Sequence, residues 1–164
     1  MTMDKAEIQR ALDLAPVHAE FDDIDPALVV YEESGWRVKD ILAHLATWDA
    51  ETLRALHAHR RGGAYSIPGY TDADDFNAYA ASMRMDEPLA LIYDGWEATR
   101  RWLRVIVGAL TPDDLSAEMT YPSGRRGTVG ALIEEIFSHQ AEHLDHIRTV
   151  LKQQNPLDGT SIED

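Results

Sequence analysis

Apolar residues recur at spacings of three and four along four long segments, and this helical periodicity constrains the fold more than any other feature of the chain. The segments are residues 4–20, 37–59, 88–110 and 128–151. In the most regular segment, the stripe consists of Leu89, Ile92, Trp96, Thr99, Leu103, Ile106 and Leu110. No run of alternating β-branched residues predicts a strand. Four long amphipathic helices predict an all-α fold and, within it, a four-helix bundle.

The connectors indicate how the four helices are joined. Pro16 predicts that the first helix kinks or ends before residue 20, because proline cannot donate the helical hydrogen bond. Residues 60–87 form the longest connector and contain a further short helical pattern at 73–83. At a rise of about 1.5 Å per residue, a bundle helix is roughly 35 Å long, which a connector of this length can span. The connector therefore allows the second and third helices to be parallel and joined by a crossover, and by itself it leaves the topology open.

Length and composition narrow the class of protein. The 164 residues predict one domain, 1–164, with the last ~10 residues as a flexible tail. The net charge of −14 argues against nucleic acid and anionic membranes as partners, because both require patches of lysine and arginine. No apolar run approaches the ~20 residues of a membrane span, and no signal peptide is recognisable, so a soluble, cytoplasmic protein is expected. The absence of cysteine excludes disulfides, thiolate metal ligands and a cysteine nucleophile.

Two histidines interrupt the apolar stripe of the last segment. Counted at ~100° per residue, His139 and His143 project into the same sector as Leu132, Ile136 and Ile147. Both rings thus point where a core leucine or isoleucine is expected. A buried imidazole needs partners for its ring nitrogens, and two imidazoles one helical turn apart can share a metal ion. The pair predicts either a metal site or two core histidines with other hydrogen-bond partners.

A catalytic metal site needs a third protein ligand besides His139 and His143. His44 is the best candidate, because it lies at the edge of the apolar stripe of 37–59, from which a side chain can reach a neighbouring helix. Neutral imidazole suits divalent zinc, nickel and iron, and zinc or nickel is the preferred expectation for this site. Three histidines leave a coordination position open for water or substrate.

Several segments of the chain resemble those of a known family. Residues 35–45, Gly-Trp-Arg-Val-Lys-Asp-Ile-Leu-Ala-His-Leu, closely resemble the W-S-V-K-D-V-L-A-H-L segment of the DinB-like superfamily. Residues 139–147, His-Gln-Ala-Glu-His-Leu-Asp-His-Ile, resemble the H-x-x-x-H-x-x-x-I pattern of its final helix. The region around Asn77, residues 88–110 and Thr-Pro-Asp-Asp-Leu at 111–115 are similar to its ClbS/DfsB branch. Together the similar segments cover most of the chain.

The resemblance implies a fold, a cofactor and a class of reaction. The fold is a four-helix bundle with a crossover between the second and third helices. The metal triad has one histidine in the second helix and two in the fourth, which correspond to His44, His139 and His143. Members often form homodimers, their activities include metal-dependent, thiol-dependent transfer and isomerisation, and ClbS-like members hydrolyse a reactive, cyclopropane-bearing genotoxin.

The expected function is therefore that of a metal-dependent hydrolase or thiol-dependent transferase. It would act on a small electrophilic molecule in detoxification or self-protection, with a low-molecular-weight thiol as a further partner. Since the chain shows no Ser-His-Asp arrangement and has no cysteine, the nucleophile is expected to be metal-bound water or an external thiol.

Three further residues near the expected ligands are candidates for supporting roles. Glu135 stands where many relatives carry an additional histidine, and His146 stands where a polar amide is common. Either can orient a ligand imidazole by a hydrogen bond, or lie on a solvated helix flank. Trp48, one turn after His44, is expected to wall the site or to pack in the core.

Two other classes of function stay open on the sequence. One is a metal-free protein of the same fold that binds and sequesters a toxic small molecule, with its histidines hydrogen-bonded in the core. The other is a structural or regulatory dimer without chemistry in a pocket. The metal content of the purified protein separates the metalloenzyme from both.

Overall fold

The computed structural model describes residues 3–155, and helices dominate this part of the chain, as the periodicity predicts. Its seven helices are α1 (Lys5–Ala11), α2 (Ala15–Phe21), α3 (Val38–Arg60), α4 (Ala73–Met83), α5 (Leu89–Ala109), α6 (Pro112–Ser116) and α7 (Val129–Gln154). Its four strands are β1 (Val29–Tyr31), β2 (Trp36–Arg37), β3 (Glu118–Thr120) and β4 (Arg126–Thr128). The predicted C-terminal tail lies outside the described residues.

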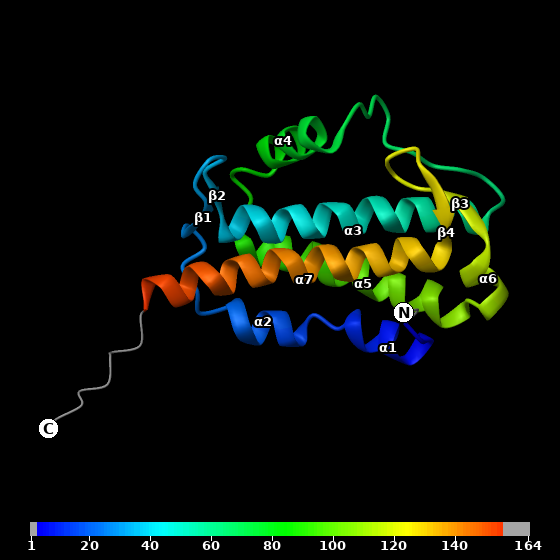
Figure 1. The fold of residues 1–164 in the computed structure, drawn as a ribbon, viewed down its shortest axis with the longest axis horizontal. Coiled ribbons are helices and arrows are strands. Elements are labelled where there is room, and N and C mark those ends of the chain that lie inside the picture. The colour runs from blue at the N-terminus through cyan, green and yellow to red at the C-terminus, as the bar shows by residue number, and fades with distance from the viewer. Residues whose placement is uncertain (1–2, 156–164) are drawn as a thin grey trace, which may run out of the picture.

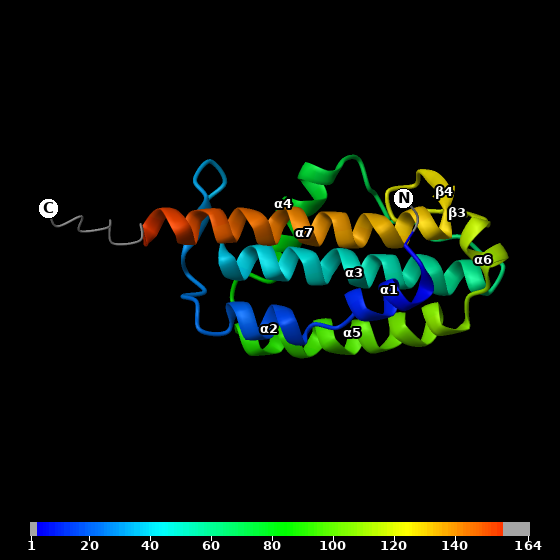
Figure 2. The same ribbon diagram turned by 60° about the horizontal axis from the view of Figure 1, so that its bottom comes forward.

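Three long helices form the body of the molecule (Figure 1). α3 and α5 run from left to right in this view, and α7 runs in the opposite direction. The shorter α1 and α2 follow one another along α5 (Figure 2). The segment between α3 and α5 passes over α3 and carries α4 (Figure 1). Among the described helices, none is both long and apolar enough to cross a membrane.

The first predicted segment, residues 4–20, is interrupted as Pro16 predicts, but the break lies before the proline, at residues 12–14 between α1 and α2. Pro16 lies in the first turn of α2, where its missing N–H costs no hydrogen bond. The break leaves carbonyl groups at the end of α1 without helical partners. Arg100 of α5 donates to the carbonyl of Ala11 at 2.9 Å, and Arg104 donates to that of Leu12 at 3.0 Å. Side chains of α5 therefore stabilise the break.

Two hairpins precede the long helices, and the expectation that the chain has no strands is wrong. β1 and β2 pair antiparallel directly before α3, and β3 and β4 pair directly before α7. With two or three residues each, the strands are too short to show alternation in the sequence. Gly35 and Gly124 lie in the turns with φ of 72° and 83°, a conformation that glycine adopts without steric strain.

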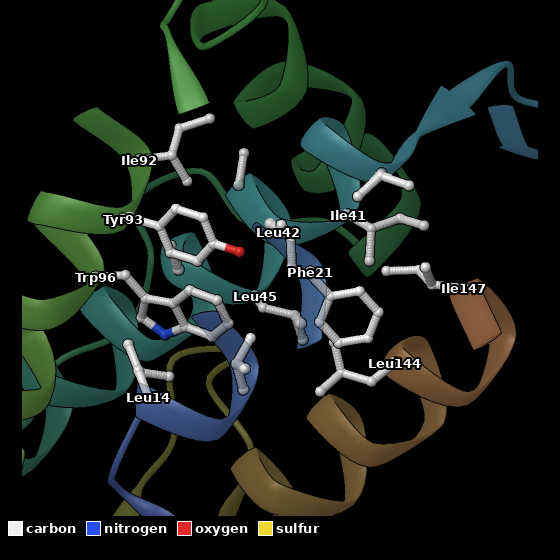
Figure 3. Packing of buried hydrophobic residues seen from close by; sticks show 14 of the residues in the cluster. Leu14, Phe21, Ile41, Leu42, Leu45, Ile92, Tyr93, Trp96, Leu144 and Ile147 are labelled. Carbon is white, nitrogen blue, oxygen red and sulfur yellow. The ribbon is translucent and has the colours of Figure 1, made fainter. Parts of the chain in front are cut away.

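The apolar core consists of two clusters at opposite ends of the bundle. Figure 3 shows the first cluster, in which Leu42 and Leu45 of α3 meet Trp96 of α5 and Leu144 of α7. The second cluster lies around Leu56, Leu103 and Leu132. Burial of such a side chain stabilises the fold by about 1.5–3 kcal/mol. Between the clusters α3 and α5 bury polar side chains, namely Asp49, Thr52 and Arg100.

Candidate metal centre

Three histidines from two helices converge at one point between α3 and α7. Nε2 of His139 lies 2.8 Å from Nε2 of His44 and 3.0 Å from Nε2 of His143. One ligand atom from each of the three rings lies within 4.8 Å of the others. The structure thus brings together the three residues that the sequence singled out as ligands.

The burial of His44 follows from the central position of α3. The sequence places His44 at the edge of the apolar stripe, yet every residue from Ile41 to Ala46 is buried. α3 packs against α5 on one side, α7 on another and α4 on a third. A helix covered on three sides buries a wider sector than a surface helix, so an edge position still points inward. The exposed fraction of His44 is 8%.

Burial keeps the three imidazoles neutral near pH 7. Desolvation lowers the pKa of His44 to about 3, with smaller effects of the His139 and His143 rings. Desolvation likewise lowers the pKa of His143 to about 4 and lowers that of His139. A neutral imidazole keeps one ring lone pair free to bind a metal ion.

The three Nε2 atoms cannot satisfy one another by hydrogen bonds alone. Each Nε2 carries either one proton or one lone pair. Nε2 of His139 faces two other ring nitrogens, Nε2 of His44 and Nε2 of His143. One proton or one lone pair would have to serve both contacts. A divalent metal ion accepts a lone pair from each ring at about 2.0–2.1 Å, which places tetrahedral ligand nitrogens about 3.3 Å apart. The two contacts of His139, at 2.8 Å and 3.0 Å, lie within about 0.5 Å of this value, so the donor set fits such an ion.

Tyr31 of β1 holds the outer nitrogen of His143. Its Oη lies 2.8 Å from Nδ1 of His143 and 2.5 Å from Nδ1 of His146. If Nε2 of His143 keeps its lone pair, Nδ1 carries the proton and donates it to Oη. The Tyr31 hydroxyl then donates to His146. Desolvation, with a smaller effect of Glu142, raises the pKa of Tyr31, so the phenol keeps its proton.

The supporting residues that the sequence proposed have different positions. His146 is exposed and reaches His143 only through Tyr31. Glu135 is exposed, and its carboxylate pairs with Arg125 rather than with a histidine. Neither contact places the side chain directly on a ligand nitrogen.

An aromatic cluster borders the histidines on the α4 side. The indole of Trp48 donates to Oδ1 of Asn77 at 2.9 Å, and its ring meets that of Phe76 edge-on at 5.1 Å. Trp36 of β2 lies 5.1 Å from the ring of His44, measured between centroids. Trp48 also lines the cavity that His139 borders.

A cavity of about 200 Å³ lies beside His139. α3, α7 and the β3–β4 hairpin surround it. Its wall consists of Trp48, Asp49, Thr52, Tyr121, Pro122, Ser123, Leu132, Glu135, Ile136 and His139. A small molecule can therefore lie next to one of the three histidines.

Asp49 is a buried carboxylate in this wall that the sequence reading missed. Its Oδ2 accepts hydrogen bonds from Trp96 Nε1 and from Arg100 Nε, each at 2.5 Å. Arg100, itself fully buried, also donates to Oε1 of Gln140 at 2.6 Å. The signal in the sequence is an acidic residue on the buried stripe of α3, between Leu45 and Thr52. A buried charge of this kind requires a partner, and Arg100 provides it.

Comparisons with known proteins place the chain in a family. A search of curated proteins returns no significant match. The fold is similar to that of an uncharacterised protein from Clostridium difficile 630, with 16% identity, a TM-score of 0.69, and coverage of 93% of this chain and 98% of that one. It is also similar to a protein from Streptococcus pneumoniae, with 13% identity, a TM-score of 0.66, and coverage of 93% and 92%. The model of the DinB superfamily matches residues 9–147, and the chain therefore belongs to the DinB superfamily.

Proposed function

We propose that His44, His139 and His143 bind one divalent transition metal ion, zinc or nickel in the first place and iron as a further candidate. With this ion the protein acts as a hydrolase or a thiol-dependent transferase on a small electrophilic molecule, in detoxification or self-protection. The observation that carries the proposal is the convergence of three neutral Nε2 atoms beside a cavity. When bound, the ion lowers the pKa of a water or thiol and polarises the electrophile.

The chain supplies a proton acceptor in the same cavity. Two hydrogen bonds fix Oδ2 of Asp49, whereas Oδ1 accepts none from the described residues. Arg100 places a positive charge beside this carboxylate, with Nε 2.5 Å from Oδ2. We assign Asp49 the role of accepting the proton that the nucleophile loses. The nucleophile itself comes from outside the chain, since the chain has no cysteine.

The finer family assignment belongs to the same proposal. We place the chain in the ClbS/DfsB branch, because Thr-Pro-Asp-Asp-Leu at 111–115 is similar to a segment of that branch; here Thr111 caps α6 and residues 112–115 form its first turn. The branch's description as a four-helix bundle applies if α1 and α2 count as one helix. The parallel course of α3 and α5 then corresponds to its crossover (Figure 1). The lack of cysteine accords with the cytoplasm, where disulfides are not maintained.

One observation favours a second candidate function. The cavity beside His139 has aromatic walls in Trp48 and Tyr121 and offers space for a small molecule. A metal-free protein could sequester a small molecule there. Metal analysis distinguishes this binder from the metalloenzyme.

The decisive experiment is an elemental analysis of the purified and the metal-reconstituted protein. We expect about one first-row metal ion per chain, bound by three histidines. His139→Ala and His143→Ala should lose the metal while their circular dichroism stays helical. His57→Ala, which removes an exposed histidine from the same α3 helix, is the matched control and should keep the metal. Absence of metal from both preparations would refute the metalloenzyme and favour the binder.

The class of reaction requires a separate assay. The metal-loaded protein is incubated with small electrophiles, with and without low-molecular-weight thiols. Turnover without a thiol indicates a hydrolase, and turnover that depends on a thiol indicates a transferase. No turnover of any electrophile by a fully loaded protein would contradict both.

A further inference from the structure

A groove of about 400 Å³ lies between α3 and α5, away from the three clustered histidines. α3 lines it with Leu53, Arg54, His57 and Arg60, and α5 lines it with Trp102, Val105 and Ile106. None of these residues borders the cavity beside His139. On α3, His57 follows His44 by 13 residues, which is about 20 Å along the helix axis. The groove is therefore a separate feature, and its volume is typical of sites for small molecules.

The α5 side of the groove presents apolar surface to water. Trp102, Val105 and Ile106 lie about one turn apart on α5 and share a face of the helix. Ile106 is buried, whereas the exposed fractions of Trp102 and Val105 are 63% and 60%. Covering such side chains removes apolar area from water, which stabilises a complex roughly in proportion to that area. This side of the groove favours a ligand with an apolar body.

The α3 side of the groove is basic. Its charged or titratable side chains are those of Arg54, His57 and Arg60, and no acidic side chain lines the groove. Residues 53–61 and 98–110, the two stretches that contain the whole lining, include no aspartate or glutamate, although the chain has 29 of them. The net charge of −14 therefore does not describe this groove, whose own charge is of the opposite sign.

The two arginines of the groove differ in their partners. Arg54 pairs with Glu51, whose other carboxylate oxygen accepts a hydrogen bond from the hydroxyl of Tyr65 at 2.5 Å. Arg60 forms no ion pair with any residue that the structure describes. A planar guanidinium binds a carboxylate through two parallel hydrogen bonds, and Arg60 has its donors free for such a contact.

The polarity of a helix explains only part of this arrangement. Basic side chains are favourable in the last turn of any long helix, and Arg60 lies in the last turn of α3. This effect does not explain why α5 exposes an indole and a valine side chain beside the same turn. The combination of both helices is typical of a site for a molecule that is apolar at one end and anionic at the other.

We infer that this groove is a second binding site, which takes a small amphipathic carboxylate from solution. The aliphatic or aryl body of the ligand lies on Ile106 and against Trp102, and its carboxylate accepts hydrogen bonds from Arg60. A neutral apolar molecule would leave the guanidinium without a partner, and a purely polar anion would leave the apolar lining exposed. The site requires no metal ion, because none of its residues belongs to the histidine cluster.

The inference is tested by calorimetric titration of the chelator-treated full chain with 4-phenylbutyrate. 4-Phenylbutanamide and 4-phenylbutylamine share its apolar body but lack the negative charge, and inorganic phosphate has the charge without the body. For about a dozen non-hydrogen atoms we expect saturable binding of 4-phenylbutyrate in the millimolar range or tighter. The other three probes should bind about tenfold more weakly or worse. Equal affinity for the amide and the carboxylate, or no saturable binding of 4-phenylbutyrate, would overturn the inference.

A charge reversal tests whether Arg60 is the anchor. Arg60→Glu should reverse the preference of the site, so that 4-phenylbutylamine binds more tightly than 4-phenylbutyrate. Arg61→Glu is the matched control, since it makes the same charge change at the next residue, which does not line the groove. This control should keep the preference for the carboxylate. Equal effects of the two variants would mean that only the general surface charge matters, and would refute the site. Circular dichroism of each variant shows that the fold is retained.

Another possible occupant of the groove is a second copy of the chain. Sedimentation velocity of the full chain and of Trp102→Glu, without any probe, distinguishes this occupant from a small molecule. Self-association that Trp102→Glu abolishes, together with no binding of 4-phenylbutyrate, would assign the groove to the second copy and overturn the inference. With a small carboxylate as the ligand, Trp102→Glu should instead weaken 4-phenylbutyrate binding and leave the sedimentation of the chain unchanged.

Discussion

The hydroxyl of Tyr31 lies 2.8 Å from Nδ1 of His143, although 112 residues separate them in the sequence. The β1–β2 hairpin brings Tyr31 to this position from the opposite side of the bundle to α5. A ring nitrogen that is held by a hydrogen bond fixes the tautomer and the orientation of the imidazole. The hairpin thus contributes a residue to the candidate metal centre, in addition to connecting α2 to α3.

Tyr31→Phe should lower metal affinity without removing the metal ligands. The variant keeps the aromatic ring but loses the hydroxyl that orients His143, and loss of such a contact typically costs about 10–100-fold in affinity. Competition with a chromophoric chelator measures the change. Tyr79→Phe on α4 serves as the control and should bind metal like the unaltered protein. Equal affinities of both variants would show that Tyr31 has no orienting role.

The metal-free protein should lose stability as the pH falls below about 6.5. The folded-state pKa values of His44, at about 3, and His143, at about 4, lie below the ordinary histidine value of 6.5. Between pH 6.5 and the folded-state pKa of each histidine, the unfolded chain binds protons that the folded chain does not. The free energy of unfolding therefore decreases as the pH is lowered through this range. The slope is at most about 1.4 kcal/mol per pH unit for each histidine. Above pH 6.5 these groups should contribute no slope.

Urea unfolding of chelator-treated protein between pH 7.5 and pH 4 checks this behaviour. In His44→Leu the contribution of that residue to the slope should disappear. The metal-loaded protein should release its ion in the same acidic range, because protons compete for the ligand lone pairs. Stability of the metal-free protein that is independent of pH would contradict the buried, neutral state of the cluster.

Asp49→Asn should destabilise the protein far more than loss of a surface ion pair. The substitution leaves the buried Arg100 without its counter-charge, and breaking such a pair costs about 3–5 kcal/mol. Asp13→Asn removes the partner of Arg104, a more exposed pair at 3.4 Å, and should cost less than about 1 kcal/mol. Chemical denaturation compares the two variants. Similar values for both would mean that the buried charge is compensated in another way.

Gly127→Ala should displace Tyr121 from the wall of the cavity. A Cβ atom at residue 127 would overlap the hydroxyl of Tyr121, which donates to the carbonyl of Thr128 at 2.7 Å. Overpacking of this kind costs about 1–3 kcal/mol. Gly108→Ala on α5 is the control, because its Cβ meets only Gln9 Nε2, at 3.6 Å, and alanine favours the helix. Thermal unfolding should therefore move in opposite directions for the two variants.

The sequence predicts the long helices of this fold well, because their apolar stripes extend over several turns. Residues 37–59 and 88–110 agree with α3 and α5 to within one residue at each end. The hairpins could not be predicted, since two or three residues carry no period. The break after α1 depends on hydrogen bonds from Arg100 and Arg104, which lie about 90 residues further along the chain.

The candidate site was predictable where its residues share a helix face. His139 and His143 lie one turn apart on an otherwise apolar stripe, and this local pattern is visible in the sequence. Tyr31 could not be found in this way, because its role depends on the path of a hairpin. Asp49 was detectable in principle, as an acidic residue on a buried stripe, but only the fold shows that Arg100 is its partner.

The connector between α3 and α5 can vary in length and composition without disturbing the long helices, and such variation can alter which molecules reach the histidine cluster. Arg84 and Asn77 attach this segment to α3 through Thr47 and Trp48, and α4 forms a roof near the histidine cluster. The roof only has to return the chain to the start of α5, so its length and composition are not tied to the packing of the long helices. Closing a longer loop costs little free energy. Insertions in the roof can therefore reshape access to the histidines while the bundle beneath keeps its register.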